Sequence, residues 1–450
     1  MKPTRILFLP VFFLSISLNI SAQNCGTGFL GTKTLYSKPA NKPTANPVGY
    51  VPVFINYVGR HGARHLTKDV KTNFAYQLLF QADSLQALTA KGQELMRMVL
   101  KLEKLENGNT KSISAEGRAE LQAIGERMVQ HNPNVFKQPV SLKVLVTKEK
   151  RTEQSADAFF TGINSLLKNK PEISRTTDDT NLRFYDFSPA YDAFNESDAI
   201  AKSIQSLQKT EQIDLIDKAF SERIFKDPFV QKLSPKQTEK FAAEVFGFAT
   251  IVYSLQTEIK QAGFQAEDLN FTQFFSCEEL AHLGLVDAAE DYLKKGPGTD
   301  IKGIQIKIAV PLLINFIKTT DEFITGGNYN AQLRFAHAET ILPFAALLNI
   351  STADKTVSDL SKLNQYWQPE NIAPLSSNIQ WILYQKKGNE NYLVKVLLNE
   401  KEVHITGLKT NNFPFYNWND LKAFYLKKLS DWNIKPDADM NLYLKRLAVN

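Results

Sequence analysis

Apolar and polar positions follow two different periods along this chain. Strand-like runs occupy 51–58, 140–146, 333–337, 378–385 and 392–399, and a further short strand is expected at 403–406. Helical spacing fills 74–105, the segments that begin at Ser114 and Ser155, and the stretch after Asn417. Strands interleaved with helices in the first and last thirds of the chain predict one α/β sheet domain.

The middle of the chain has a different pattern. Residues 193–299 are rich in helix formers and long charged side chains and show almost no strand-like alternation. The segment Gly296-Pro297-Gly298 ends this stretch, and 301–317 is expected to form one helix with a kink at Pro311. We therefore expect an α/β domain at 23–192 and 300–450, interrupted by an α-helical lid at 193–299.

The first residues resemble a targeting segment. Lys2 and Arg5 precede the apolar stretch 6–20, and Ser21-Ala22 follows it, which is typical of a signal peptide at 1–22. No later segment has the roughly 18 consecutive apolar residues that a membrane span needs. The sequence therefore predicts export to the periplasm or the extracellular space, without a membrane anchor.

Charge and cysteine content exclude several classes of function. The formal charge falls from +6 to +4 when Lys2 and Arg5 are removed, and no basic stripe interleaved with aromatic residues appears, so nucleic acid is not an expected partner. Cys25 and Cys277 are the two cysteines, and the sequence leaves open whether they pair. No cluster with the spacing of metal ligands is present, so neither a metal nor an organic cofactor is implied.

The most informative motif is Arg60-His61-Gly62-Ala63-Arg64, directly after the first predicted strand. Each arginine can bind phosphate oxygens in pairs, and the glycine lets the backbone approach an anion closely. A neutral imidazole between them could attack phosphorus and become a covalent phosphohistidine. The alternative is a basic surface turn without a function.

A second motif delivers a histidine and a carboxylate two residues apart. His337 and Glu339 follow a predicted strand, and Glu339 or Thr340 could cap the next helix, with Pro343 in its first turn. Arg151 also lies at a strand-to-helix junction, where the alternative is an ordinary surface arginine. Because ligands bind beyond the carboxyl ends of strands in such sheets, we expect the three junctions to converge.

The residues now carry a family resemblance. RHGAR near the start, paired with HAE late in the chain, resembles the histidine acid phosphatases, and the HAE form resembles their multiple inositol polyphosphate phosphatase branch, whose members act as phytases. Three further stretches, at 114–128, 150–162 and 374–400, agree with this resemblance. It implies a phosphoglycerate-mutase-like, three-layer α/β sheet domain with an inserted helical domain.

The chain departs from the family at one position. The first motif of the family usually continues to a proline, where this chain has Leu66, so the loop could lose rigidity on its substrate side. In the wider family a Thr-Lys pair at this point resembles a substrate contact, and we carry Thr67 and Lys68 over as such. His65 could reach substrate or be structural, and the sequence does not decide between the two.

The resemblance implies a mechanism and a substrate. His61 would be the nucleophile and Glu339 the general acid and later base, while phosphate would be held by Arg60, Arg64, Arg151 and His337. The implied substrates are myo-inositol hexakisphosphate and lower inositol phosphates, hydrolysed stepwise. The alternatives are a broad acid or sugar-phosphate phosphatase and, from another class, a phosphate-ester binding protein without turnover.

Overall fold

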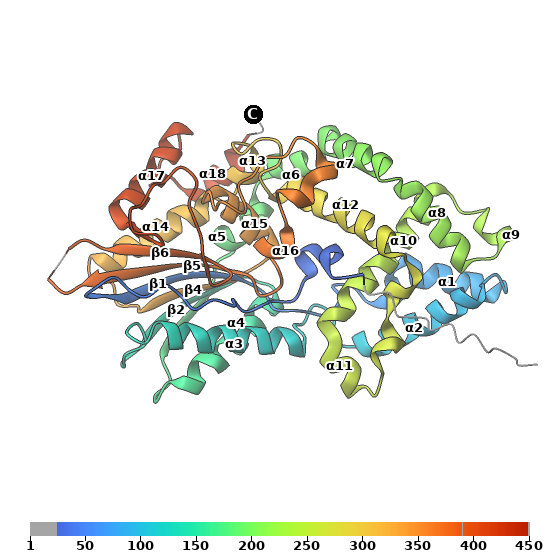
Figure 1. The fold of residues 1–450 in the computed structure, drawn as a ribbon, viewed down its shortest axis with the longest axis horizontal. Helices are drawn as coiled ribbons and strands as arrows, with labels where there is room; N and C mark the ends of the chain where they lie inside the picture. The colour runs from blue at the N-terminus through green and yellow to red at the C-terminus, as the bar shows by residue number, and fades with distance from the viewer. Residues whose placement is uncertain (1–24, 389, 449–450) are drawn as a thin grey trace, which may run out of the picture.

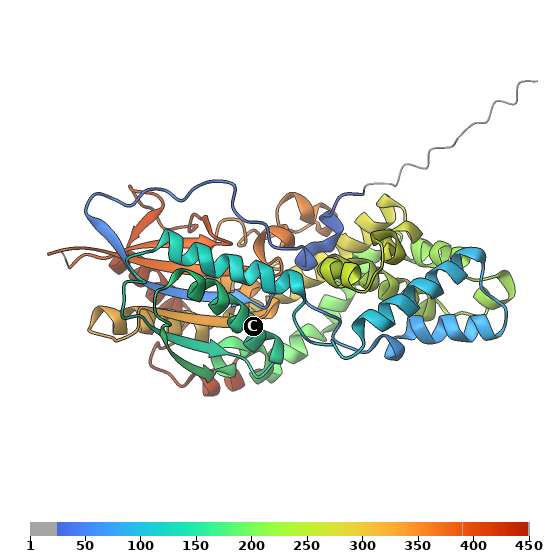
Figure 2. The same cartoon turned by 90° about the horizontal axis from the view of Figure 1, so that it is seen from below.

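The computed structural model describes residues 25–388 and 390–448. Over these residues the molecule is elongated, with a layered sheet at one end and a bundle of helices at the other (Figures 1 and 2). The expected signal peptide, 1–22, lies outside the described residues. Among the described helices none is both long and apolar enough to span a bilayer.

A mixed eight-stranded sheet forms the framework of the site. Its strands are β1 (Tyr50–Arg60), β2 (Ser141–Val146), β3 (Glu172–Thr177), β4 (Ala331–Ala336), β5 (Asn378–Lys386), β6 (Leu393–Leu398), β7 (Lys401–Glu402) and β8 (Phe415–Asn417). The order is β3-β2-β4-β1-β5-β6-β7, with β8 paired to β6. The first four strands of this order are parallel, and β5 and β6 are antiparallel to their neighbours.

The apolar runs 51–58, 140–146, 333–337, 378–385 and 392–399 correspond to β1, β2, β4, β5 and β6. The strand expected at 403–406 is wrong, because β7 ends at Glu402 and only Ile405 forms an isolated bridge, to Ile350. Strand β3 was not predicted, because it is an edge strand with every residue exposed and therefore has no buried face to produce an apolar alternation.

Helices cover both faces of the sheet. α3 (Ala115–His131) and α4 (Lys150–Leu166) lie on one face, and α14 (Val310–Ile324), α15 (Ala338–Leu347) and α17 (Trp418–Asp431) lie on the other (Figure 1). Short helices complete this end: α5 (Asp179–Leu182), α6 (Pro189–Asn195), α13 (Ile304–Lys307), α16 (Pro369–Ile372) and α18 (Met440–Arg446). Each face buries its own hydrophobic cluster, so the sheet is the middle of three layers. This is the predicted three-layer arrangement.

The single kinked helix expected at 301–317 is wrong. The chain forms α13 and then α14, and Pro311 lies in the first turn of α14, where its lack of an N–H removes no hydrogen bond of the helix. The expected start of α15 also needs correction. This helix begins at Ala338 with His337 as the N-cap residue, so neither Glu339 nor Thr340 caps it, and Pro343 lies inside the helix.

A third hydrophobic cluster fills the helical end. The helices at this end of the molecule are α1 (Phe74–Ser84), α2 (Ala90–Glu106), α7 (Asp198–Thr210), α8 (Ile213–Ile224), α9 (Asp227–Val230), α10 (Pro235–Ile251), α11 (Gln256–Gln261) and α12 (Cys277–Lys295), and the buried residues of α7 belong to a cluster beside the sheet. α1 and α2 precede the expected insertion in sequence yet pack against α8 and α10 (Figure 1). The domain boundaries stay a prediction, and this packing shows which earlier helices share the core of the helical end.

Helix α12 joins the two ends of the molecule. It contacts α8 in the helical end and α15 beside the sheet. The 3-10 helix η1 (Gly28–Lys33) packs along it, and Cys25 forms a disulfide with Cys277 at the first residue of α12. The pairing that the sequence left open is therefore present. It fastens the start of the described chain to the helix that ends above the sheet edge.

Candidate active site

Two histidines meet at the carboxyl edge of the sheet. β1 and β4 are parallel neighbours in register at Arg60 and Ala336, so the residues that follow them, His61 and His337, leave the sheet at the same edge. The His61 backbone N–H donates to the Ala336 carbonyl at 3.0 Å. The two rings lie edge to face with centroids 5.6 Å apart. Adjacent parallel strands thus place the two sequence motifs side by side.

His61 is held in one neutral form. It is 4% exposed, and its Nδ1 lies 3.0 Å from the Gly62 carbonyl oxygen. Because a carbonyl can only accept, Nδ1 carries the proton and Nε2 keeps its lone pair. Burial, and then the nearby charge of Arg60, holds the pKa of His61 well below its usual range. The acceptor that the sequence could not identify is the carbonyl of the next residue.

The loop after β1 is packed tightly against the start of α3. The Ser114 N–H donates to the Ala63 carbonyl at 2.8 Å. A Cβ atom added to Gly117 would lie 2.2 Å from the Ala63 oxygen, and one added to Gly62 would lie 2.7 Å from the Gly117 oxygen. The two facing glycines, Gly62 and Gly117, therefore let the loop after β1 approach α3 more closely than larger residues would allow.

The side chains of Arg60 and Arg64 lie in different environments. Arg60 is 5% exposed, and its Nη1 donates to the carbonyls of Thr32 and Ala373, the second at 2.7 Å. Arg64 is half-buried, and its Nη1 donates to the His65 carbonyl at 2.8 Å. Burial and the neighbouring charges of Arg60 and Arg151 lower the pKa of Arg64 to about 10. Mutual repulsion of these cations favours an anion between them.

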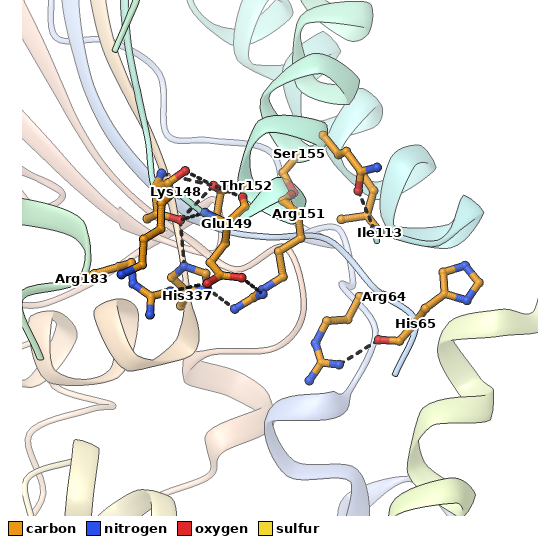
Figure 3. Close-up of polar contacts among 12 residues, drawn as sticks. Arg64, His65, Ile113, Lys148, Glu149, Arg151, Thr152, Ser155, Arg183 and His337 are labelled. Carbon is orange, nitrogen blue, oxygen red and sulfur yellow. Dashed lines mark hydrogen bonds and ion pairs between the residues drawn. The ribbon is translucent and has the colours of Figure 1, made fainter. Parts of the chain in front are cut away.

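Arg151 reaches the same sheet edge from β2, the strand on the other side of β4. It lies in the first turn of α4, and its Nη2 donates to His337 Nδ1 at 3.2 Å, while Nη1 donates to Glu149 at 2.8 Å. Glu149 also forms an ion pair with Arg183 at 3.3 Å. Figure 3 shows the guanidinium groups of Arg64 and Arg151 near one another, with Glu149 and His337 on the side of Arg151 that is away from Arg64.

His337 is neutral in this arrangement. Its Nδ1 accepts from Arg151, and its Nε2 lies 3.0 Å from the Thr147 hydroxyl, so the proton is on Nε2. Burial, and then the Arg151 cation, lowers the pKa of His337 to about 3. Both ring nitrogens are engaged within the protein, so contact with a phosphate oxygen would require His337 to exchange one of these partners.

Glu339 lies in the first turn of α15 with 39% of its side chain exposed. Its carboxylate is 3.3 Å from the ammonium of Lys295, at the last turn of α12, and Lys295 is also 2.7 Å from Asp291. Burial opposes ionisation of Glu339, but the Lys295 cation, together with His337, a backbone hydrogen bond and Arg60, outweighs burial and holds the pKa of Glu339 well below its usual range. Glu339 is thus an accessible carboxylate held against a cation.

A cavity of about 220 Å³ lies between the loop after β1 and helix α10. It is lined by Arg60, Arg64, Thr67 and Lys33 together with Leu66, Leu375 and side chains of α10 and the segment that follows it. Lys68 is exposed and is not among the lining residues. The structure therefore gathers Arg60, Arg64 and Thr67 around one hollow, and neither Arg151 nor Lys68 belongs to its lining. Within the described residues no group of three metal-ligating side chains occurs.

Several residues of the site were not singled out from the sequence. Glu149 and Thr147 belong to the strand-to-helix junction that contains Arg151, so their position in the sequence could have indicated that they lie at the site. Arg183 follows the unpredicted strand β3, and Lys295 lies at the end of a helix more than forty residues before Glu339. No local pattern shows that α12 ends above the sheet edge, so Lys295 could not have been found by spacing.

Comparison with known proteins agrees with this architecture. The family model for the histidine phosphatase superfamily (branch 2) matches residues 53–399, and no curated protein sequence matches the chain. The chain is similar to the multiple inositol polyphosphate phosphatase of Bifidobacterium longum in its complex with phosphate, with a TM-score of 0.78, 20% identity and coverage of 89% of this chain and 98% of that one.

Two further structures show the same fold. The B. longum enzyme in complex with inositol hexasulfate has a TM-score of 0.76 at 20% identity, covering 88% of this chain and 97% of that one. The phytase from D. castellii has a TM-score of 0.66 at 15% identity, covering 92% and 89%. The predicted fold class and family are confirmed. Since the family model spans most of the chain, including both motifs, this protein belongs to branch 2 of the histidine phosphatase superfamily.

Proposed function

We propose that this protein is an exported phosphomonoesterase that hydrolyses inositol polyphosphates, phytate among them, stepwise through a phosphohistidine. The observation that carries the proposal is the His61 ring, a buried neutral imidazole with its Nε2 lone pair free of the proton, beside the guanidinium groups of Arg60, Arg64 and Arg151. A nucleophile among cations is suited to a phosphate monoester, whose negative charge would otherwise repel it.

In the first step, Nε2 of His61 attacks phosphorus and the bond from phosphorus to the ester oxygen breaks. The leaving alkoxide takes the proton of the Glu339 carboxyl group. In the second step, Glu339 as a carboxylate takes a proton from water, whose oxygen attacks phosphorus as the bond to Nε2 breaks. The guanidinium groups stabilise charge on the non-bridging oxygens in both transition states. General acid catalysis of this kind contributes about 10²- to 10⁴-fold in rate.

The charge state of Glu339 follows from what lies beside it. Lys295 stabilises the carboxylate in the free enzyme, whereas the first step needs the protonated acid. A bound phosphate brings negative charge close to both groups. It offsets the Lys295 cation and thereby favours protonation of Glu339 when substrate is present.

A substrate with several phosphates fits the distribution of cations. Lys33 in the cavity, Lys295 above Glu339 and Arg183 beyond Glu149 surround the central arginines, so neighbouring phosphates of one ring would each find a cation. The B. longum neighbour was solved with inositol hexasulfate, a polyanion of the same shape as phytate. Export is supported by the disulfide between Cys25 and Cys277, a bond that persists in oxidising compartments.

Two measurements test the proposal. Phosphate release from phytate should exceed that from a simple aryl phosphate at equal concentration, and equal rates would favour the broad acid phosphatase. After reaction with a ³²P-labelled ester and a rapid quench without acid, the wild type and Glu339→Gln should contain labelled phosphohistidine, whereas His61→Ala should not. Labelled phosphohistidine in His61→Ala would exclude His61 as the nucleophile.

A further inference from the structure

The residue next to Arg64 is a buried histidine that the mechanism does not use. His65 is 2% exposed, and Figure 3 shows its ring pointing away from Arg151, on the opposite side of the chain from the Arg64 guanidinium. It therefore does not face the phosphate site. The open question of whether it reaches substrate is settled by this orientation in favour of a role within the protein.

The ring of His65 lies between two carboxylates of the helical end. Its Nδ1 is 3.4 Å from Glu106, the last residue of α2, and its Nε2 is 3.7 Å from Glu258 in α11. A carboxyl oxygen faces each ring nitrogen, and this arrangement favours the imidazolium form of His65. Burial opposes this charge, yet the two glutamates raise the pKa of His65 to about 9. Glu116 of α3 lies beside Glu258 and hydrogen-bonds to it, and burial raises the pKa of Glu116.

The same glutamates hold the backbone around the ring. Glu106 accepts from the Leu66 N–H at 3.0 Å, and Glu258 accepts from the Ala115 N–H at 2.6 Å, at the start of α3. The His65 N–H donates to the Ser112 carbonyl at 3.0 Å. The position of the His65 peptide is thus determined from both sides of the ring. Its carbonyl is the group that accepts from Arg64 at 2.8 Å.

We propose that His65 is a positioning residue: its ring, clamped between Glu106 and Glu258 of the helical end, fixes the carbonyl that orients the Arg64 guanidinium at the phosphate site. The clamp replaces the stiffness that a proline at position 66 would give this loop, because Leu66 is held through its N–H, a donor that proline lacks. Orientation matters here because an arginine binds phosphate through a planar fork of fixed geometry.

The consequence is a coupling between the two ends of the molecule. The phosphate-binding loop follows a strand of the sheet, while both carboxylates come from helices of the other end. A change in how the helical end seats against the sheet would reach Arg64 through His65. The inference rests on the phosphate-binding role of Arg64 in the proposed function, but not on the identity of the ester.

A double-mutant cycle between His65→Gln and Arg64→Lys tests this proposal, with p-nitrophenyl phosphate as substrate and kcat/KM as the readout. Arg64→Lys removes the planar guanidinium group and should lower kcat/KM by about 100-fold, by analogy with the loss of one transition-state donor. His65→Gln should cost about 10-fold, and the double variant should stay near the 100-fold of Arg64→Lys, because residues that act through one another are not additive. A merely structural role would instead multiply the two losses to about 1,000-fold.

His282→Gln is the matched control. This histidine also lies between two glutamates, Glu211 and Glu278, on α12 and its neighbour, and none of its contacts reaches the loop after β1. Its kcat/KM should equal that of the wild type. Should His65→Gln fail to fold, as judged by its melting curve, Glu106→Gln takes its place in the same cycle.

The outcomes separate this inference from the proposed function. A full loss in Arg64→Lys with less than twofold loss in His65→Gln, or multiplicative losses in the double variant, would overturn the role of His65 alone. Unchanged activity in Arg64→Lys would remove Arg64 from the phosphate site, and with it both the proposed role of that arginine and this inference.

Discussion

Replacement of Lys295 by methionine should shift the pH dependence of hydrolysis, since Lys295 determines how strongly Glu339 holds its proton. The Lys295 ammonium is 3.3 Å from the Glu339 carboxylate. Two unit charges at this separation interact by about 5 kcal/mol at an effective dielectric constant of 20 and by about 1 kcal/mol in water. Because 39% of the Glu339 side chain is exposed, screening keeps the interaction toward the lower end, at about 1–3 kcal/mol. We therefore expect the pKa of Glu339 to rise by about one to two units in Lys295→Met.

The sign follows from the role of the acid. Only protonated Glu339 can donate to the leaving oxygen, so raising its pKa extends the active range to higher pH. The assay is kcat/KM against pH for an alkyl phosphate, whose leaving group needs a proton, because this profile reports the pKa values of the free enzyme and free substrate. Ionisation of the substrate is common to both enzymes and cancels in the comparison. Weaker substrate binding in the variant lowers the whole profile without moving its limbs.

The control is Lys294→Met. Lys294 is adjacent in sequence and pairs with Glu290, at 2.5 Å, rather than with Glu339. Its profile should coincide with that of the wild type. An alkaline limb that stays in place in Lys295→Met, or that moves equally in Lys294→Met, would refute the assignment of that limb to Glu339.

Three further predictions concern stability and the loop after β1. Folding raises the pKa of His65 from 6.5 to about 9, so its protonation should add about 3 kcal/mol to the free energy of unfolding below pH 6.5, and this contribution should be lost as pH rises through 9. Denaturant titrations should show this fall in the wild type but not in His65→Gln. Reduction of Cys25–Cys277, which closes a separation of 252 residues, should lower unfolding free energy by about 5 kcal/mol in the chain-entropy account and decrease Tm in calorimetry. Gly117→Ala would place a methyl group 2.2 Å from the Ala63 oxygen, so kcat/KM should fall by about 10-fold or more, and wild-type activity would contradict this close contact.

The strands that carry the chemistry could be predicted because they are buried. Most residues of β1 and every residue of β4 are buried, which produces the largely apolar runs that end near Arg60 and Ala336. Parallel strands with buried faces place their following residues at one edge, so the convergence of His61, His337 and Arg151 followed from the pattern. Strand β3, fully exposed at the edge of the sheet, left no such pattern and was missed.

Contacts set by tertiary packing could not be predicted in this way. The carbonyls of Thr32 and Ala373 that accept from Arg60 come from segments without a motif, and backbone carbonyls are available at every position, so no sequence pattern marks these two. The partners of His65 and Glu339 lie on helices of the other end of the molecule. Lys295 is one of many lysines on amphipathic helices, and only the path of α12 distinguishes it.

The two ends of the molecule therefore contribute different parts of one site. The sheet edge supplies the groups that would react with phosphorus, and it fixes them by strand register, which tolerates little change. The helical end supplies Lys295 and the carboxylates around His65, groups that adjust the proton affinity of Glu339 and the orientation of Arg64. Since a strand register is nearly invariant while helices can shift against a sheet, changes in the helical end can alter rate and substrate preference without disturbing the nucleophile. The pH profile of Lys295→Met and the cycle at His65 measure this division at two independent positions.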